Sequence, residues 1–184
     1  MMKRSQLIIL FFLVFQGCAS LFGTHNGGDT TLYRKISTHE FKILQDRVTI
    51  TTKDVWNLSA KEEIERAFIA FSLLVEQHLG IDSEKVLESL KGSRMEFQCV
   101  PYPTHVKGDL DCGVVFGDKL YGGMYIPGTT PLLLVGWRGN FSRSGFAHEL
   151  LHHVFYKFLG KLGESDEMNK LESVFTTELK NRGF

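Results

Sequence analysis

The chain lacks an excess of charge of either sign, and it contains no internal repeat. Its 184 residues include 21 Lys and Arg against 21 Asp and Glu, so the formal net charge is zero. No basic patch stands out along the sequence, whereas nucleic-acid-binding proteins depend on such patches for their affinity. We therefore expect no nucleic-acid partner.

Long hydrophobic runs are also missing, because the apolar stretch at residues 7–15 is too short to span a bilayer. This stretch follows Lys3 and Arg4, which is the arrangement of a secretory signal peptide. The Phe-Gln-Gly-Cys sequence that ends at Cys18 resembles a bacterial lipobox. The resemblance implies cleavage before Cys18 and acylation of that residue. Because Ala19 rather than Asp follows, it also implies a place at the outer membrane facing the periplasm. A plain secretory signal cut one or two residues later is the alternative, and both interpretations predict export to the cell envelope.

The composition divides the chain into three parts. We assign residues 1–17 to the signal peptide and residues 18–31 to a flexible tether, because that stretch is small, polar and rich in glycine. Residues 32–184 are enough for one domain with a sizeable core.

Cysteine is scarce, with three residues in the whole chain. If Cys18 carries lipid, Cys99 and Cys112 remain as an even pair in an oxidising compartment, which predicts a disulfide. Closing a loop of this size would stabilise the fold by about 3 kcal/mol. The alternative, a pair of metal-binding thiols, has no Cys-x-x-Cys spacing to support it.

The pattern His-Glu-x-x-His at residues 148–152 carries the most specific chemistry in the sequence. Apolar residues recur at helical spacing on both sides of it, and Gly160 ends the run, so we expect a helix. In a helix, His148 and His152 share one face and can bind one Zn²⁺ together. Glu149 lies one step around the helix, where it can accept a proton from a metal-activated water. The alternative is an amphipathic helix whose histidines are only partly exposed polar residues.

On His148, Glu149 and His152 the chain resembles the zincin metallopeptidases. The resemblance implies a zinc-dependent hydrolase of peptide bonds, with Glu149 as general base and later proton donor. Metzincins have a Gly three positions after the second His, and a His or Asp three positions further on. Phe155 and Phe158 occupy those positions here, which excludes that subgroup.

The resemblance to the gluzincin subgroup implies a third zinc ligand about twenty positions after the second His. Glu172 lies at that distance, on a helix that we expect to begin after Ser165 as its N-cap. Asp166 and Glu167 are alternatives for the same role. An oxyanion-stabilising side chain is also expected from the family, and three residues are available for it: Tyr125, Tyr156 and His105. His153 points about a hundred degrees away from His152 on the helix, so we interpret it as a supporting or packing residue.

The rest of the chain predicts an α+β fold. We expect a small, mostly antiparallel sheet, one long backing helix, the motif helix and a C-terminal helix. A capping box of Ser59 and Glu62 predicts that the long helix spans residues 59–79. A shorter helix is expected at 83–91, and strands are expected on both sides of a turn in 39–52 and at 94–100, 112–116, 119–126 and 131–135.

Two functions remain open at this stage. The first is a zinc metallopeptidase whose peptide or protein substrate pairs with one of the strands between residues 121 and 136, as the zincin resemblance implies. The second is a metal-binding or structural envelope lipoprotein without turnover.

Overall fold

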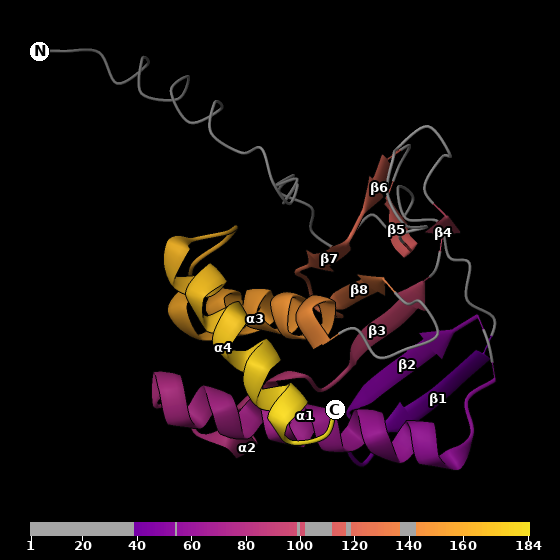
Figure 1. Cartoon of the computed structure of the whole chain (residues 1–184), viewed down its shortest axis with the longest axis horizontal. Coiled ribbons are helices and arrows are strands. Elements are labelled where there is room, and N and C mark those ends of the chain that lie inside the picture. Colours follow the sequence, from indigo (N-terminus) through magenta and orange to yellow (C-terminus); the bar gives the residue numbers. More distant parts are fainter. Residues whose placement is uncertain (1–38, 54, 99, 102–111, 117–118, 137–142) are drawn as a thin grey trace, which may run out of the picture.

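The computed structural model describes residues 39–53, 55–98, 100–101, 112–116, 119–136 and 143–184. These residues form an α+β fold with a five-stranded mixed sheet, a separate three-stranded sheet and four helices (Figure 1). The predicted signal peptide and tether, the lipidation residue Cys18, Cys99 of the predicted disulfide and His105 all lie outside the described residues.

The five-stranded sheet has the spatial order β1–β2–β3–β8–β7. Its strands are β1 (His39–Ile43), β2 (Val48–Thr52), β3 (Ser93–Gln98), β8 (Leu132–Gly136) and β7 (Gly123–Ile126). The outer pairs β1–β2 and β7–β8 are antiparallel, whereas β2–β3 and β3–β8 are parallel. The expectation of a mostly antiparallel sheet is therefore wrong for this sheet. Parallel neighbours need a crossover connection, and two helices between β2 and β3 provide one of them.

The smaller sheet is fully antiparallel. It consists of β4 (Val100–Pro101), β5 (Cys112–Phe116) and β6 (Lys119–Tyr121) in that order. The chain passes from β6 into β7 across Gly122, so the small sheet adjoins the end of the large one near β7 (Figure 1).

The first two helices fill the crossover between β2 and β3. α1 (Leu58–Leu79) confirms the predicted long helix, but its N-cap is Asn57 rather than Ser59: the Asn57 side chain accepts a hydrogen bond from the amide of Ala60 at 2.8 Å. α1 ends at Gly80, which adopts the left-handed conformation with φ 66°. α2 (Ser83–Ser89) follows after a short turn.

The last two helices carry the motif and its surroundings. α3 (Arg143–Leu159) contains the His-Glu-x-x-His pattern, and α4 (Asp166–Asn181) begins after Ser165, whose hydroxyl accepts from the Met168 amide at 3.1 Å. Both helices and the Ser165 cap were predicted and are confirmed.

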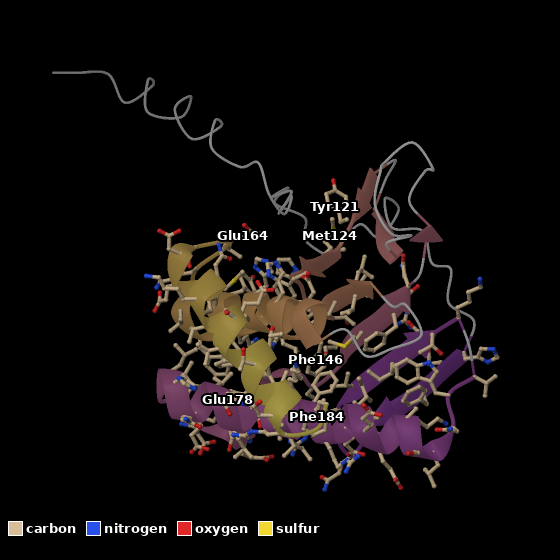
Figure 2. All side chains as sticks on the ribbon, viewed as in Figure 1. Tyr121, Met124, Phe146, Glu164, Glu178 and Phe184 are labelled. Carbon is tan, nitrogen blue, oxygen red and sulfur yellow. The ribbon has the colours of Figure 1, made fainter. Side chains whose placement is uncertain are left out.

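Phenylalanine side chains hold α1, α3 and α4 together. Phe146 of α3 meets Phe68 of α1 edge-to-face at 5.0 Å between ring centroids, and Phe71 of α1 meets Phe175 of α4 in the same way at 5.3 Å. The four rings are almost completely buried. Figure 2 shows Phe146 inside the helical layer, where it anchors the first turns of α3 against α1.

The helical layer packs on one face of the large sheet. Alternate strand residues face it and join its core, whereas their neighbours on β7 and β8, Met124, Leu132 and Leu134, form a separate small cluster. α3 lies nearest to β7 and β8, so the motif sits above the β7–β8 edge of the sheet (Figure 1). Among the described residues, no helix is both long and apolar enough to cross a membrane.

Candidate metal centre

The two motif histidines converge, as their spacing predicts. The Nε2 atoms of His148 and His152 lie 3.1 Å apart, with the rings nearly perpendicular at 85°. A tetrahedral ion with bonds of 2.0–2.1 Å places two ligand nitrogens about 3.3 Å apart. The pair is thus close to the arrangement that a single ion requires.

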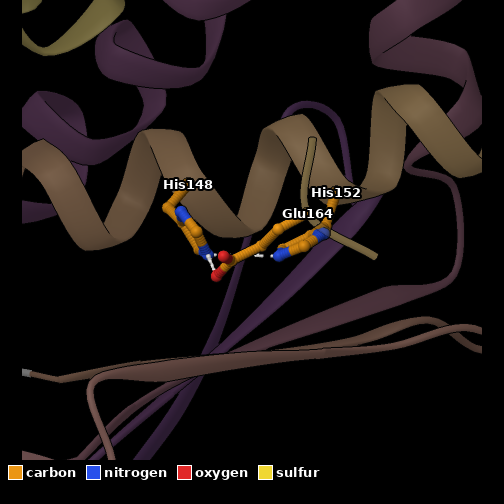
Figure 3. Close-up of side chains that lie close together, drawn as sticks. All are labelled: His148, His152 and Glu164. Atoms are coloured by element: carbon orange, nitrogen blue, oxygen red, sulfur yellow. Dashed lines mark hydrogen bonds and ion pairs between the residues drawn. The ribbon is translucent and has the colours of Figure 1, made fainter. Parts of the chain in front are cut away.

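Glu164 adds a carboxylate to this pair. One of its oxygens, Oε1, lies 3.8 Å from His148 Nε2, and the ligand atoms of all three residues lie within 4.8 Å of one another. Figure 3 shows the Glu164 carboxylate between the two imidazoles, below the axis of α3. His148, His152 and Glu164 therefore form a group that could hold a metal ion.

Glu164 reaches the group because the connection between α3 and α4 turns back sharply. Gly160 ends α3 with φ 61°, and Gly163 follows with φ 82°, a conformation that residues with a Cβ rarely adopt. The amide of Lys161 bonds back to the Phe155 carbonyl at 3.0 Å. These two turns bring the next residue, Glu164, over the histidine face of α3. The sequence contains one signal for Glu164: it directly follows two closely spaced glycines, Gly160 and Gly163, between two predicted helices.

Glu172, the ligand implied by the gluzincin resemblance, occupies a different place. Its Oε2 lies 2.8 Å from Nδ1 of His148, the ring nitrogen that does not face His152. An ionised carboxylate only accepts, so His148 donates its Nδ1–H to Glu172 and keeps a lone pair on Nε2. This contact fixes the tautomer that a metal ligand needs.

The two alternatives to Glu172 also lie outside the converging group. Glu167 pairs with Lys161 at 2.7 Å on the exposed side of the connection. Asp166 is exposed in the first turn of α4. Neither belongs to the set of ligand atoms that meet at His148 and His152.

Glu149 is buried beside the histidines, with 1% of its surface exposed. Its carboxylate lies against Gly123 of β7, where an added Cβ would overlap Glu149 Oε1 and approach the Leu134 carbonyl oxygen to 3.0 Å. No group among the described residues hydrogen-bonds to its Oε2, although that atom is buried. A buried acceptor without a partner is costly, and a water or ligand that hydrogen-bonds to this oxygen would remove that cost.

The surroundings shift the pKa values of the motif residues. Burial raises the pKa of Glu149 to about 8; the His148 ring lowers it, and the carboxylates of Glu172 and Glu164 raise it further. Burial lowers the pKa of His152 to about 4, assisted by the neighbouring His148. His152 therefore stays neutral at physiological pH, which is the form that binds a metal.

A second set of polar groups lies behind His152. His153 is buried, and its Nε2 lies 2.9 Å from Ser89 Oγ of α2, while its Nδ1 lies 3.2 Å from the Tyr125 hydroxyl of β7. The Tyr125 ring is parallel to the His152 ring, with an interplanar angle of 5° and 6.4 Å between centroids. Of the candidates for oxyanion stabilisation, Tyr125 thus lies beside the motif. The ring of Tyr156, a second candidate, contacts the Tyr125 ring with 6.1 Å between their centroids.

Comparison of the chain with protein-family models, with curated proteins and with solved structures finds no match.

Proposed function

We propose that the chain is a zinc-dependent metallopeptidase of the zincin type, with His148, His152 and Glu164 as metal ligands and Glu149 as general base. The observation that carries the proposal is the meeting of two imidazole nitrogens and a carboxylate beside a buried, unpartnered carboxylate oxygen of Glu149. Metal ligands alone would fit a structural site, but the additional buried acceptor favours a reaction.

The donor set supports zinc. Two histidines and one glutamate are a common ligand set of catalytic zinc, which leaves the fourth tetrahedral position open. We assign the third ligand to Glu164 rather than Glu172, because Glu164 faces the histidine Nε2 atoms. Glu172 holds His148 through its other nitrogen and increases its basicity as a ligand.

Glu149 has the placement of a proton acceptor. A zinc ion would polarise a substrate carbonyl and lower the pKa of a water molecule in the open position. Without a metal, the pKa of Glu149 is about 8, so its carboxyl is largely protonated at neutral pH. The charge of a bound zinc ion would lower this pKa, and the ionised Glu149 would then take the proton of that water through Oε2 and deliver it to the leaving amine nitrogen. Its contact with Gly123 limits where the carboxylate can move.

The sheet topology favours one of the two candidate strands for substrate binding. β8 pairs with β3 on one side and β7 on the other, whereas β7 is the last strand of the large sheet. An extended peptide could therefore add to β7, beside Glu149 and His152, by backbone hydrogen bonds. The proposed substrate class is a peptide or protein in extended conformation.

The first test is the metal content and peptidase activity of the purified protein. We expect close to one zinc per chain and cleavage of some members of a broad peptide library. Glu149→Gln should abolish cleavage but retain zinc, because it removes the base and no ligand. Absence of zinc even after its addition would refute the metal site. Zinc without cleavage of any peptide would favour the metal-binding or structural lipoprotein instead.

The N-terminal sequence supports the proposal that this peptidase is exported and anchored in the bacterial cell envelope through lipid on Cys18. Incorporation of a labelled fatty acid in cells, and its loss in Cys18→Ser, would establish the anchor. Equal labelling of the Cys18→Ser protein would place the modification elsewhere. The same export would allow the disulfide between Cys99 and Cys112. Thiol alkylation of the denatured protein tests this, because the two cysteines should gain the mass of the label only after reduction.

A further inference from the structure

The hydrogen bonds of His153 have only one consistent direction. Ser89 Oγ lies 2.6 Å from the Val86 carbonyl, which can only accept, so the single hydroxyl hydrogen of Ser89 is used there. The Ser89 oxygen must then accept from Nε2–H of His153 at 2.9 Å. A neutral imidazole protonated at Nε2 has its lone pair on Nδ1, so Tyr125 donates its hydroxyl hydrogen there at 3.2 Å.

Three elements are joined by this chain of bonds. Ser89 ends α2, His153 lies on α3 next to the metal-ligand candidate His152, and Tyr125 lies on β7. Each contributes a side chain that is at least partly buried. A hydrogen bond away from water is electrostatically stronger, so a satisfied network there holds its side chains in one arrangement.

α3 and β7 make two contacts in the same register. Glu149 of α3 contacts Gly123 of β7, and one helical turn later His153 contacts Tyr125. Gly123 and Tyr125 are alternate residues of β7, about 6.8 Å apart along a strand. Glu149 and His153 are four residues apart on α3, about 6.0 Å along a helix. These near-equal steps place Glu149 on Gly123 and His153 against Tyr125 at the same time.

We propose that Ser89, His153 and Tyr125 form a positioning chain that fixes the plane of the His152 imidazole for metal binding. The fixed Tyr125 ring lies parallel to the His152 ring, 6.4 Å away between centroids, and limits its rotation. Tyr125 is then a positioning residue, because its hydroxyl hydrogen is already used by His153. This assignment rests on the proposed metal function and removes Tyr125 from the candidates for oxyanion stabilisation.

The experiment compares zinc affinity and cobalt spectra of variants that stay folded. Tyr125→Phe keeps the ring but removes the donor, and Ser89→Ala removes the hydroxyl that accepts from His153 while the Ser89 backbone contact to the ring remains. We expect each to weaken Zn²⁺ binding, measured by chelator competition, about tenfold, as loss of such supporting bonds does. We also expect each to shift the visible absorption of bound Co²⁺. The double variant should lose less than the product of the two effects, since both act through His153.

Two matched variants test whether the effect is specific. Tyr156→Phe removes a hydroxyl from a ring that touches Tyr125 but does not belong to the chain of bonds, so it should bind Zn²⁺ as the wild type does. Ser89→Thr keeps the hydroxyl and should restore affinity relative to Ser89→Ala. If Tyr125→Phe lowers peptide cleavage while Zn²⁺ affinity and the Co²⁺ spectrum stay unchanged, the positioning role is wrong and the oxyanion role returns.

The tautomer of His153 provides a measurement that does not depend on metal or on any variant. Long-range ¹H–¹⁵N correlation spectra of the metal-free protein should show His153 protonated at Nε2 and bare at Nδ1. The opposite tautomer, or a mixture, would overturn the directed chain. Wild-type protein with the expected tautomer but no Zn²⁺ affinity would instead refute the proposed function, and with it the positioning of a metal ligand.

Discussion

The carboxylate of Glu149 on α3 occupies the space that a side chain at residue 123 would need, so β7 can approach the motif helix only because Gly123 has no Cβ. In this way the edge of the sheet determines where the proposed general base lies. The contact joins two residues that are distant in the sequence. A substitution that adds a single methyl group at residue 123 tests it.

Gly123→Ala should displace the Glu149 carboxylate. The new Cβ would overlap Oε1, and the Leu134 carbonyl on the other side cannot move away easily. We expect a loss of stability of about 1–3 kcal/mol from overpacking. We also expect loss of most peptidase activity with zinc retained, as measured by chemical denaturation, cleavage assay and metal analysis.

Gly122→Ala is the matched control, because a Cβ there would meet nothing within 4 Å. It should retain activity and stability. Equal losses in both variants would show that chain flexibility, and not the Glu149 contact, explains the first result.

The metal-free protein should be most stable near pH 6.5. The native pKa of Glu149 is raised from 4.5 to about 8, so its contribution to stability is lost as pH rises through that interval. The native pKa values of His152 and His153 are lowered from 6.5 to about 4, so their contributions are lost as pH falls through that interval. Between pH 4.5 and 6.5 the two histidines outweigh the one glutamate, and between pH 6.5 and 8 Glu149 is the one of these three groups that still changes the stability.

Denaturant unfolding across pH in the presence of a chelator measures this profile. Each group changes the free energy of unfolding by about 1.4 kcal/mol per pH unit within its interval. Glu149→Gln, which has no titrating proton, should flatten the decline between pH 6.5 and 8. An unchanged decline in that variant would contradict the buried environment described for Glu149.

Three glutamates of the α3–α4 region should differ in their effect on zinc affinity. Glu164→Ala removes a proposed ligand and should weaken binding most. Glu172→Gln removes the carboxylate that holds His148 and should weaken binding by about 10–100-fold. Glu167→Ala breaks only an exposed pair with Lys161 and should have no measurable effect on affinity. A larger effect of Glu172→Gln than of Glu164→Ala would return the ligand role to Glu172.

Phe184 should stabilise the domain without influencing the metal site. Its side chain is 8% exposed within the core, its amide bonds to the Leu179 carbonyl at 3.0 Å, and the Arg66 guanidinium lies over its ring (Figure 2). Phe184→Ala should cost about 2–4 kcal/mol of unfolding free energy. The exposed Asn181→Ala serves as control and should cost much less. A change in zinc affinity of the folded Phe184→Ala protein would be contrary to this expectation.

Much of the helical architecture was predictable because it depends on residues close together in the chain. Apolar spacing and capping residues predicted both ends of α1 to within a residue, the end of α3 and the start of α4. The motif spacing alone predicted that His148 and His152 share a helix face. The cap of α1 shows the limit of such patterns. Ser59 and Asn57 both fit the role, and the side-chain geometry selects Asn57.

The order of the strands was beyond local patterns. Alternation predicts that a segment is a strand, but it does not determine which strand lies beside it or in which direction. The parallel pair of β2 with β3 follows from the crossover through α1 and α2, whereas β3 and its other parallel neighbour β8 are connected through β4, β5, β6 and β7. The expected mostly antiparallel sheet was therefore wrong for the large sheet. In the resulting order, β7 is the last strand of the large sheet.

The sequence by itself determined that two histidines share one face of a helix with a glutamate one step around it, since this follows from helical periodicity, whereas the burial of Glu149 is a finding of the tertiary structure. Only the tertiary structure decided which carboxylate meets the histidines, because that depends on how the chain turns at Gly160 and Gly163. It also decided that Gly123 receives Glu149 and that Tyr125 bonds to His153. These contacts join segments far apart in the chain, and their geometry is determined by the packing of α3 on the sheet.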